Sequence, residues 1–334
     1  MRSLALALAI GSLLAGPACT DEPSEGVEVG PGDPGGDTDT GAGQGGDPDG
    51  PGLPDPPSSP GPARSPLPIL LLHGAAGFDR IGPLEYFFDV ADTLERAGHV
   101  VFTTEVDPLQ TVEVRAAELA AEVDAILDST GAGRVHLIGH SMGGLDARFL
   151  ISSLGYGDRV ATLTTISTPH LGSRVADIAL DILPGVAEEA LGFLVDLLAG
   201  AAAGSEQDAA GQILQLSEAY AVGTFNPANP DDPRVAYFSV AGVTQVNPFA
   251  DPLRNDLCDG LLLAGYALLA TSGPNDGLVT VASAQHGTFL GTVPADHLDE
   301  VGQLLGTTSP AFDHRAFYLA LAEFLTSPDA PAPL

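Results

Sequence analysis

The sequence predicts an α/β fold, in which a doubly wound, mostly parallel sheet is covered by helices and carries a helical insertion. Short apolar runs alternate along the chain with longer segments of helical periodicity, which is the pattern of parallel strands joined by crossover helices. One apolar run leads directly into a glycine-rich pentapeptide centred on a serine, and a helical segment follows it. A later stretch is rich in Ala, Leu and Gly at helical spacing and contains no strand-like run.

At the amino terminus, residues 1–19 have the layout of a secretory signal, because Arg2 precedes a short apolar run and small residues follow that run. The run is too short to span a membrane. Cys19 lies where a lipoprotein signal carries its acylated cysteine, and cleavage after Ala18 by an ordinary signal peptidase fits nearly as well. We therefore expect a secreted protein or an outer-membrane-anchored lipoprotein, with Cys19 as the lipid anchor in the second case.

The next segment, residues 20–66, is dominated by Gly, Pro, Asp and Ser, so it cannot offset the entropy cost of folding. We expect a disordered acidic linker there and one catalytic domain over residues 67–334. The chain has 12 basic residues, all of them Arg, against 44 acidic ones, and its formal net charge of −32 would repel a phosphate backbone. Nucleic acid is therefore excluded as a partner. Cys258 is the one cysteine besides Cys19, so we expect no disulfide framework.

The elements of this domain can be predicted in chain order. Strands are expected at residues 67–72, 99–104, 134–138, 161–166 and 235–241, and helices at 84–97, 111–129 and 145–152. The insertion lies at about residues 174–224. One side of a helix within it is apolar, formed by Val186, Ala190, Leu194, Leu197 and Leu198. Ordinary packing would explain such a face, but we favour a mobile lid over an apolar binding site.

The pentapeptide Gly139-His140-Ser141-Met142-Gly143 has the pattern G-x-S-x-G, with a strand predicted before it and a helix after it. This context is that of a nucleophile elbow, where a tight turn projects the serine from the end of a sheet. Its glycines are needed because the turn leaves no room for side chains beside the serine. The sequence therefore predicts an α/β-hydrolase fold with Ser141 as its nucleophile.

A serine hydroxyl needs a histidine to take its proton and a carboxylate to orient that histidine. In this fold the acid and then the histidine follow the serine along the chain. Asp276, within Asn-Asp-Gly, and His297, within Asp-His-Leu, occur in that order. From position alone His286 and His314 remain alternatives for the base, and Asn-Asp-Gly is equally typical of a plain turn.

The tetrahedral intermediate needs two backbone N–H donors for its oxyanion. One is expected from Met142, directly after the nucleophile. The other is expected from Ala75, in the His-Gly-Ala-Ala-Gly loop that follows the first apolar strand. These glycines would also suit an ordinary strand end, but a His-Gly pair in this place favours the oxyanion role.

Taken together, the motifs resemble those of the pseudomonad-type true lipases, triacylglycerol hydrolases of the α/β-hydrolase superfamily. The resemblance extends over about residues 67–324 and is weakest in the helical insertion. It is carried by segments 68–79, 104–107, 113–115, 137–144, 167–173, 275–279 and 296–303. It implies that Asp276 and His297 are the acid and base of the triad, and that His286 and His314 have structural or surface roles.

The resemblance also implies a structural Ca²⁺ ion near the catalytic histidine. Asp299 and Gln303 match its ligands by their offsets from His297, and Thr307 would supply a carbonyl oxygen. The remaining aspartate is Asp256 by its spacing before the triad acid, with Asp259 as a local alternative. Oxygen ligands of this kind suit a hard cation.

The chain departs from this family at a cysteine position and in its acidic amino-terminal segment. Several relatives have a cysteine shortly after Asn-Asp-Gly, where this chain has Ala282, so that disulfide is absent. Some relatives require a dedicated folding chaperone. The resemblance implies a lipid ester substrate at a lipid–water interface. The alternatives are an esterase, a phospholipase or a polyester depolymerase with the same triad, and a non-catalytic surface lipoprotein that uses the fold as a scaffold.

Overall fold

The computed structural model describes residues 67–81, 84–181, 208–244, 257–303 and 305–327. The signal and linker expected over residues 1–66 lie outside these ranges, as do the apolar face of the insertion between Val186 and Leu198 and the candidate calcium ligand Asp256. Among the described residues, no helix has the length and apolar character needed to cross a membrane.

The core of the molecule is a six-stranded parallel sheet, with the strand order β4-β1-β5-β6-β7-β8. The strands are β1 (Ile69–Leu72), β4 (Val101–Thr103), β5 (Val135–His140), β6 (Val160–Ile166), β7 (Ala236–Gly242) and β8 (Thr288–Val293). This sheet, with the helices that connect its strands, confirms the predicted fold class.

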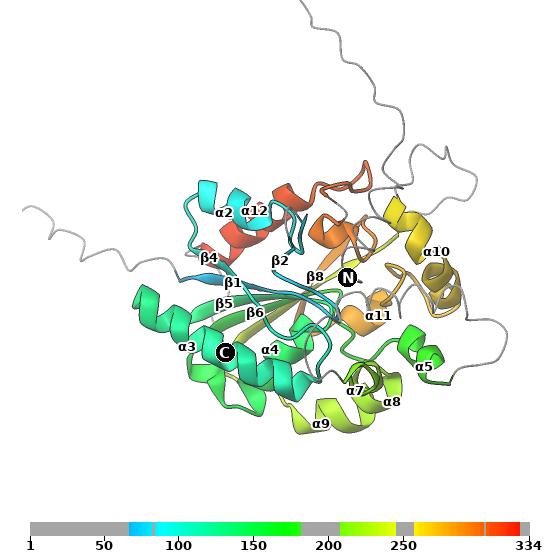
Figure 1. Cartoon of the computed structure of the whole chain (residues 1–334), viewed down its shortest axis with the longest axis horizontal. Helices are drawn as coiled ribbons and strands as arrows, with labels where there is room; N and C mark the ends of the chain where they lie inside the picture. Colours follow the sequence, from blue (N-terminus) through cyan, green and yellow to red (C-terminus); the bar gives the residue numbers. More distant parts are fainter. Residues whose placement is uncertain (1–66, 82–83, 182–207, 245–256, 304, 328–334) are drawn as a thin grey trace, which may run out of the picture. The chain divides into compact units, whose positions relative to one another are not determined.

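Helices cover both faces of the sheet, as Figure 1 shows. Helices α2 (Val90–Arg96) and α12 (His314–Thr326) lie on one face, and α3 (Val112–Thr130) and α4 (Gly143–Ser152) lie on the other. Alternate residues of β1 serve the two sides: Ile69 and Leu71 pack with α2 and α12, and Leu70 and Leu72 pack with α3 and α4. Both faces of β1 are therefore buried, which explains its continuous apolar run.

Two local differences from the predicted elements have clear causes. The helix predicted from residue 84 begins only at Val90, because residues 80–85 form an antiparallel hairpin of β2 (Arg80–Ile81) and β3 (Leu84–Glu85). An ion pair between Arg80 and Glu85 closes it. Strand β8 was not predicted. It lies at the edge of the sheet and its side chains alternate between exposed and half-buried, so it lacks the apolar run of a central strand.

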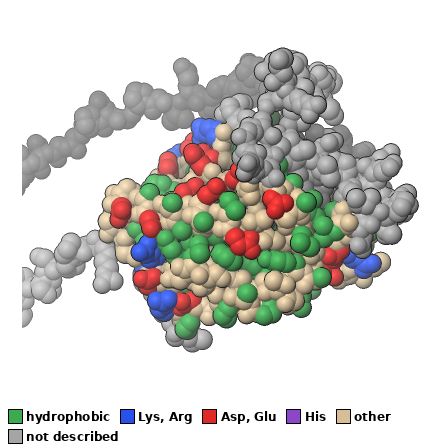
Figure 2. Space-filling view, turned by 60° about the horizontal axis from the view of Figure 1, so that its bottom comes forward, with side chains coloured by type: hydrophobic (Ala, Val, Ile, Leu, Met, Phe, Trp, Pro, Cys, Tyr) green, Lys and Arg blue, Asp and Glu red, His purple; other side chains and the backbone are tan. Residues whose placement is uncertain are grey.

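The remaining described elements are helices and helical turns. They comprise α5 (Arg174–Asp181), α7 (Ala209–Gln215), α8 (Glu218–Tyr220), a π-helical turn (Ala221–Phe225), α9 (Asn226–Ala228), α10 (Leu257–Leu269), α11 (Val281–Ala284) and two 3₁₀ turns, Tyr156–Asp158 and Asp299–Val301. Figure 2 shows one face of the molecule, on which acidic side chains are spread among apolar ones. This spread accords with the strongly negative net charge of the chain.

Candidate active site

The first component of the site is the turn between β5 and α4. Strand β5 ends at His140, helix α4 begins at Gly143, and Ser141 between them has a φ of 54°, a left-handed conformation that is rare outside glycine. The Ser141 N–H donates to the carbonyl of Ile166 at 2.9 Å, and its own carbonyl accepts from Thr168 Oγ1 at 2.7 Å. The end of β6 and the residues that follow it thus hold the turn in place.

The glycines of this turn are required by close backbone approach. A Cβ added at Gly143 would lie 2.6 Å from the carbonyl oxygen of Leu72, and one added at Gly139 would lie 2.7 Å from the amide nitrogen of Gly144. Real Cβ atoms essentially never come this close to another heavy atom. The elbow can therefore form only with glycine on either side of Ser141.

The second component is a buried pair formed by Asp276 and His297. His297 Nδ1 lies 2.7 Å from Asp276 Oδ2, and the His297 N–H donates to the Asp276 carbonyl at 3.0 Å. The other carboxylate oxygen, Oδ1, accepts the backbone N–H groups of Leu278 and Val279. Asp276 is fully buried and His297 nearly so. A carboxylate at Nδ1 selects the tautomer that leaves Nε2 free to take a proton.

The two alternative histidines have other partners. His286 Nε2 lies 2.8 Å from Asp231 Oδ1, and its ring stacks on that of His170 with centroids 4.5 Å apart. His314 begins helix α12, and its Nε2 donates to the carbonyl of Phe88 at 2.9 Å. These contacts give each ring a structural partner, and they separate both from Asp276.

The loop after β1 supplies the third component. A Cβ added at Gly74 would lie 2.7 Å from Ser141 Cβ, so the loop passes in direct contact with the serine. Ala75 and Met142, the expected oxyanion donors, belong to one apolar cluster with Val112, Leu145 and Phe225. The structure thus brings both residues to the same side of the elbow.

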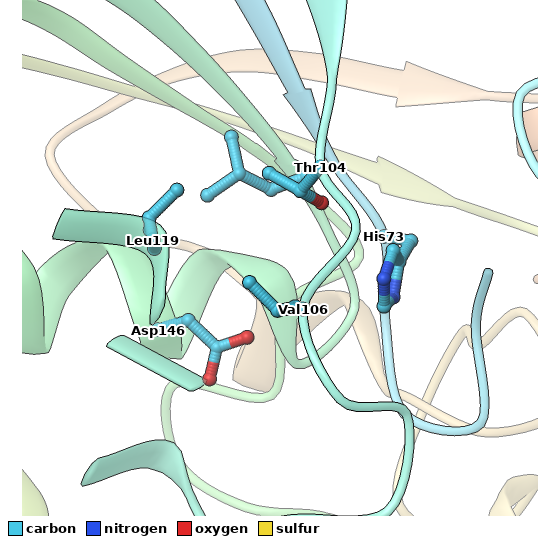
Figure 3. A pocket seen from close by; sticks show the side chains of 6 residues that line it. His73, Thr104, Val106, Leu119 and Asp146 are labelled. Carbon is cyan, nitrogen blue, oxygen red and sulfur yellow. The ribbon is translucent and has the colours of Figure 1, made fainter. Parts of the chain in front are cut away.

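Arg115 on α3 holds this loop, a role that the amino-acid sequence did not indicate. Its fully buried guanidinium donates to the carbonyl of His73 at 2.8 Å and to that of Asp107 at 2.8 Å, and it pairs with Asp146 at 2.8 Å. Burial raises the pKa of Asp146 to about 6, although the charge of Arg115 opposes that shift. A small cavity beside this ion pair is lined by Leu72, His73, Thr104, Val106, Leu119 and Asp146 (Figure 3). No triad residue lines it.

Glu300 is a second residue whose place the motif analysis did not predict. Its carboxylate is fully buried and accepts from Ser167 Oγ at 2.6 Å, with His140 Nε2 3.1 Å away. Burial raises the pKa of Glu300 well above its ordinary value, and the charge of Asp276 adds to the rise. The sequence feature that could have indicated this role is its position three residues after His297, inside segment 296–303, which resembles the true lipases.

Of the candidate calcium ligands, Asp299 and Gln303 lie close together on a buried segment. Asp299 Oδ2 accepts the Ser309 N–H at 3.1 Å, and Gln303 Nε2 donates to the carbonyl of Glu85 at 2.7 Å. Both side chains are buried, whereas Thr307 is exposed. Asp259 lies in α10, in a part whose side chains are not described.

The chain is similar in sequence to known hydrolases. A family model described as the alpha/beta hydrolase fold matches residues 68–207. A curated triacylglycerol lipase of Vibrio cholerae is 34% identical over 267 residues, which cover 72% of this chain and 81% of that protein. The triacylglycerol lipase of Burkholderia plantarii is 29% identical over 288 residues, with 72% and 80% covered.

Solved structures show the same fold. The mature form of the Bacillus licheniformis lipase BlEst2 superposes with a TM-score of 0.61 at 22% identity, covering 80% of this chain and 94% of that one. A Staphylococcus hyicus lipase gives a TM-score of 0.57 at 21% identity, with 80% and 97% covered.

Proposed function

Since this chain belongs to the α/β-hydrolase family of the triacylglycerol lipases, we propose that it hydrolyses the carboxylic esters of lipids, with triacylglycerols as substrates. The observation that carries the proposal is the buried Asp276–His297 pair, in a chain whose Ser141 has the strained conformation of a nucleophile elbow. A scaffold protein would need neither the pair nor the strain.

The proposed mechanism is acyl transfer through a covalent intermediate. His297 Nε2 takes the hydroxyl proton of Ser141 while Ser141 Oγ attacks the ester carbonyl carbon. Asp276 holds the imidazole by Nδ1 and stabilises its positive charge. The N–H groups of Ala75 and Met142 stabilise the oxyanion, the alcohol leaves with the proton from His297, and water then releases the fatty acid by the same steps.

Hydrolysis of a long-chain triacylglycerol emulsion tests this proposal, with released fatty acid measured by titration. We expect Ser141→Ala and His297→Ala each to lower the rate by at least about 10³-fold, because they remove the nucleophile and the base. Ser152→Ala, on the same helix as the elbow, serves as the control and should retain full activity. Wild-type protein that cleaves p-nitrophenyl esters or phospholipids but no triacylglycerol would identify an esterase or phospholipase instead.

We also propose a structural Ca²⁺ ion held by Asp299 and Gln303, with Thr307 and either Asp256 or Asp259 completing the site. The donor set fits a hard cation because it consists of oxygen atoms. In addition, the carboxylates of Asp276, Asp296, Asp299 and Glu300 are all buried, and their mutual repulsion would be lowered by a cation. When bound, the ion would stabilise the loop that carries His297 and would take no part in the chemistry.

Further proposals concern export and access to substrate. We propose that the protein is exported, either secreted or anchored through an acylated Cys19, as the pattern of residues 1–19 supports. Incorporation of radiolabelled palmitate that is lost in Cys19→Ala tests the anchor.

We propose that the insertion at about residues 174–224 is a lid. Activity that rises sharply once the ester forms an interface tests the lid. Refolding of the purified chain without a partner tests the need for a folding chaperone.

A further inference from the structure

A buried chain of hydrogen bonds lies behind the triad and links loops from opposite ends of the sequence. It begins at the loop after β1, where the Gly74 N–H donates to the phenol oxygen of Tyr86 at 3.0 Å. That oxygen lies 2.7 Å from His140 Nδ1, and His140 Nε2 lies 3.1 Å from Glu300 Oε2. The side chains of His140 and Glu300 are both fully inaccessible.

The far end of the chain is fixed by the ends of β6 and β7. Ser167 Oγ donates to Glu300 Oε1 at 2.6 Å and accepts the Gly242 N–H at 3.0 Å. Ser167 has a φ of 45°, a conformation that a non-glycine residue keeps only when its surroundings hold it there. A Cβ at Gly242 would lie 1.9 Å from Glu300 Oε1, so only glycine leaves room for the carboxylate.

The tautomer of His140 sets the direction of its two hydrogen bonds. Burial lowers the pKa of His140 well below its ordinary value, which keeps the ring neutral, so one ring nitrogen donates and the other accepts. The Tyr86 oxygen accepts from Gly74 and shares a second hydrogen bond with His140 Nδ1, while His140 Nε2 shares one with Glu300. The contacts therefore join the loop after β1 to Glu300 without a break.

This chain contacts the catalytic groups at two places. At one end, Gly74 touches both Tyr86 and Ser141, because a Cβ there would lie 2.8 Å from Tyr86 Oη and 3.2 Å from Ser141 Oγ. At the other, the ring of His140 lies 4.5 Å from that of His297, centroid to centroid. One nitrogen of each histidine and one oxygen of Glu300 lie within 4.8 Å of one another. A displacement of the Tyr86 hydroxyl would therefore shift the loop that carries the expected oxyanion donor.

We propose that Tyr86 is a positioning residue for the oxyanion site, and that the Tyr86–His140–Glu300–Ser167 chain fixes the distance from the Ala75 N–H to Ser141. The inference rests on the proposed function and concerns the same site. Catalytic donors act only when held within about 0.5 Å of their productive position, so one lost tether of the loop should slow turnover. Tyr86 itself takes no part in the chemical steps.

The test compares Tyr86→Phe with Tyr318→Phe. Tyr318 is a matched control because it is fully buried and its hydroxyl has no hydrogen-bond partner among the described residues. Turnover is measured on a soluble p-nitrophenyl ester and divided by the fraction of molecules that a fluorophosphonate labels at completion. We expect kcat to fall about tenfold in Tyr86→Phe with KM unchanged, which is less than the roughly 10²–10³-fold loss on removal of an oxyanion donor. Tyr318→Phe should match wild type.

A double-mutant cycle with Ser167→Ala tests whether the chain acts as one unit. Because Ser167 lies at the opposite end, its loss should reduce kcat in the wild type but add little to the loss in Tyr86→Phe. Equal kcat in Tyr86→Phe and Tyr318→Phe, a change in KM alone, or fully additive losses would overturn the inference. A wild type that cleaves the soluble ester but no triacylglycerol would refute the proposed lipid substrate and leave this test intact.

Discussion

At the scale of single residues, backbone strain is concentrated at two serines in equivalent places. Ser141 and Ser167 each follow the last residue of a central strand, β5 and β6, and both have positive φ. Each donates its N–H to the next strand, to Ile166 and Val240 respectively. A non-glycine residue in the left-handed conformation lowers the free energy of unfolding by on the order of 1–2 kcal/mol. The hydrogen bonds to the neighbouring strands hold both serines in this strained conformation.

This strain predicts that activity and stability oppose each other at Ser141. Both Ser141→Gly and Ser141→Ala should be inactive. Ser141→Gly should be more stable by about 1 kcal/mol, because glycine adopts this φ without steric strain and alanine does not. Urea unfolding of the two variants measures the difference. The same pair of substitutions at Ser152, within helix α4, should show the reverse order, since glycine destabilises a helix.

At the scale of elements, helix α3 both anchors the loop after β1 and carries an unfavourable carboxylate. Arg115 provides the anchor through its bonds to the His73 and Asp107 carbonyls. Two turns later, Glu122 is partly buried, and its Oε1 accepts the Glu105 N–H at 3.0 Å. Burial raises the pKa of Glu122 to about 7, and the charges of Glu105 and Glu118 add to the rise.

The raised pKa predicts a pH dependence of stability. A carboxyl group with a higher pKa in the folded state stabilises the fold fully below its unfolded pKa, about 4.3, and this contribution is lost as pH rises through 7. Glu122→Gln removes the ionisation, so its melting temperature relative to wild type should be higher at pH 8 than at pH 4. Exposed Glu95→Gln is the control. A difference between Glu122→Gln and wild type that stays constant from pH 4 to pH 8 would contradict the assignment.

At the scale of the whole molecule, the proposed Ca²⁺ ion would join distant segments. Asp299 contacts Ser309, and Gln303 contacts the carbonyls of Glu85 and Tyr86, more than two hundred residues earlier. An ion that binds only the folded protein stabilises it by mass action. Its loss should therefore loosen the contact between the loop that carries His297 and the hairpin near Tyr86.

Chelation tests this stabilisation directly. We expect EDTA to lower the melting temperature of wild type. Added Ca²⁺ should restore it and then raise it further, because the free energy of unfolding increases with the concentration of a ligand that binds only the folded state. Asp299→Ala should melt at the chelated temperature with or without Ca²⁺. Asp92→Ala, which removes an exposed carboxylate on α2, should behave as wild type. Identical responses of wild type and Asp299→Ala would show that the site is misplaced.

The parts of the molecule that were predictable from sequence are those with local signals. Central strands such as β5 and β6 are buried on both faces and appear as apolar runs, and the elbow is marked by glycines that its turn requires. Strand β8 and the hairpin at residues 80–85 lack such runs, so they were missed. The hydrogen bonds of Arg115 and Glu300 join residues that are far apart in sequence, so no periodic pattern in the sequence indicates them.

The order of the site residues along the chain has a consequence during synthesis. The elbow is complete once β6 has joined β5, but the pair that would activate Ser141 comes from residues 276 and 297, and Glu300 follows them. Synthesis proceeds from the amino terminus, and a domain generally folds as a unit. A growing chain therefore contains Ser141 without its base until residue 297 has been added. The nucleophile is thus made long before the groups that would activate it, and ester hydrolysis by this triad cannot begin before His297 pairs with Asp276.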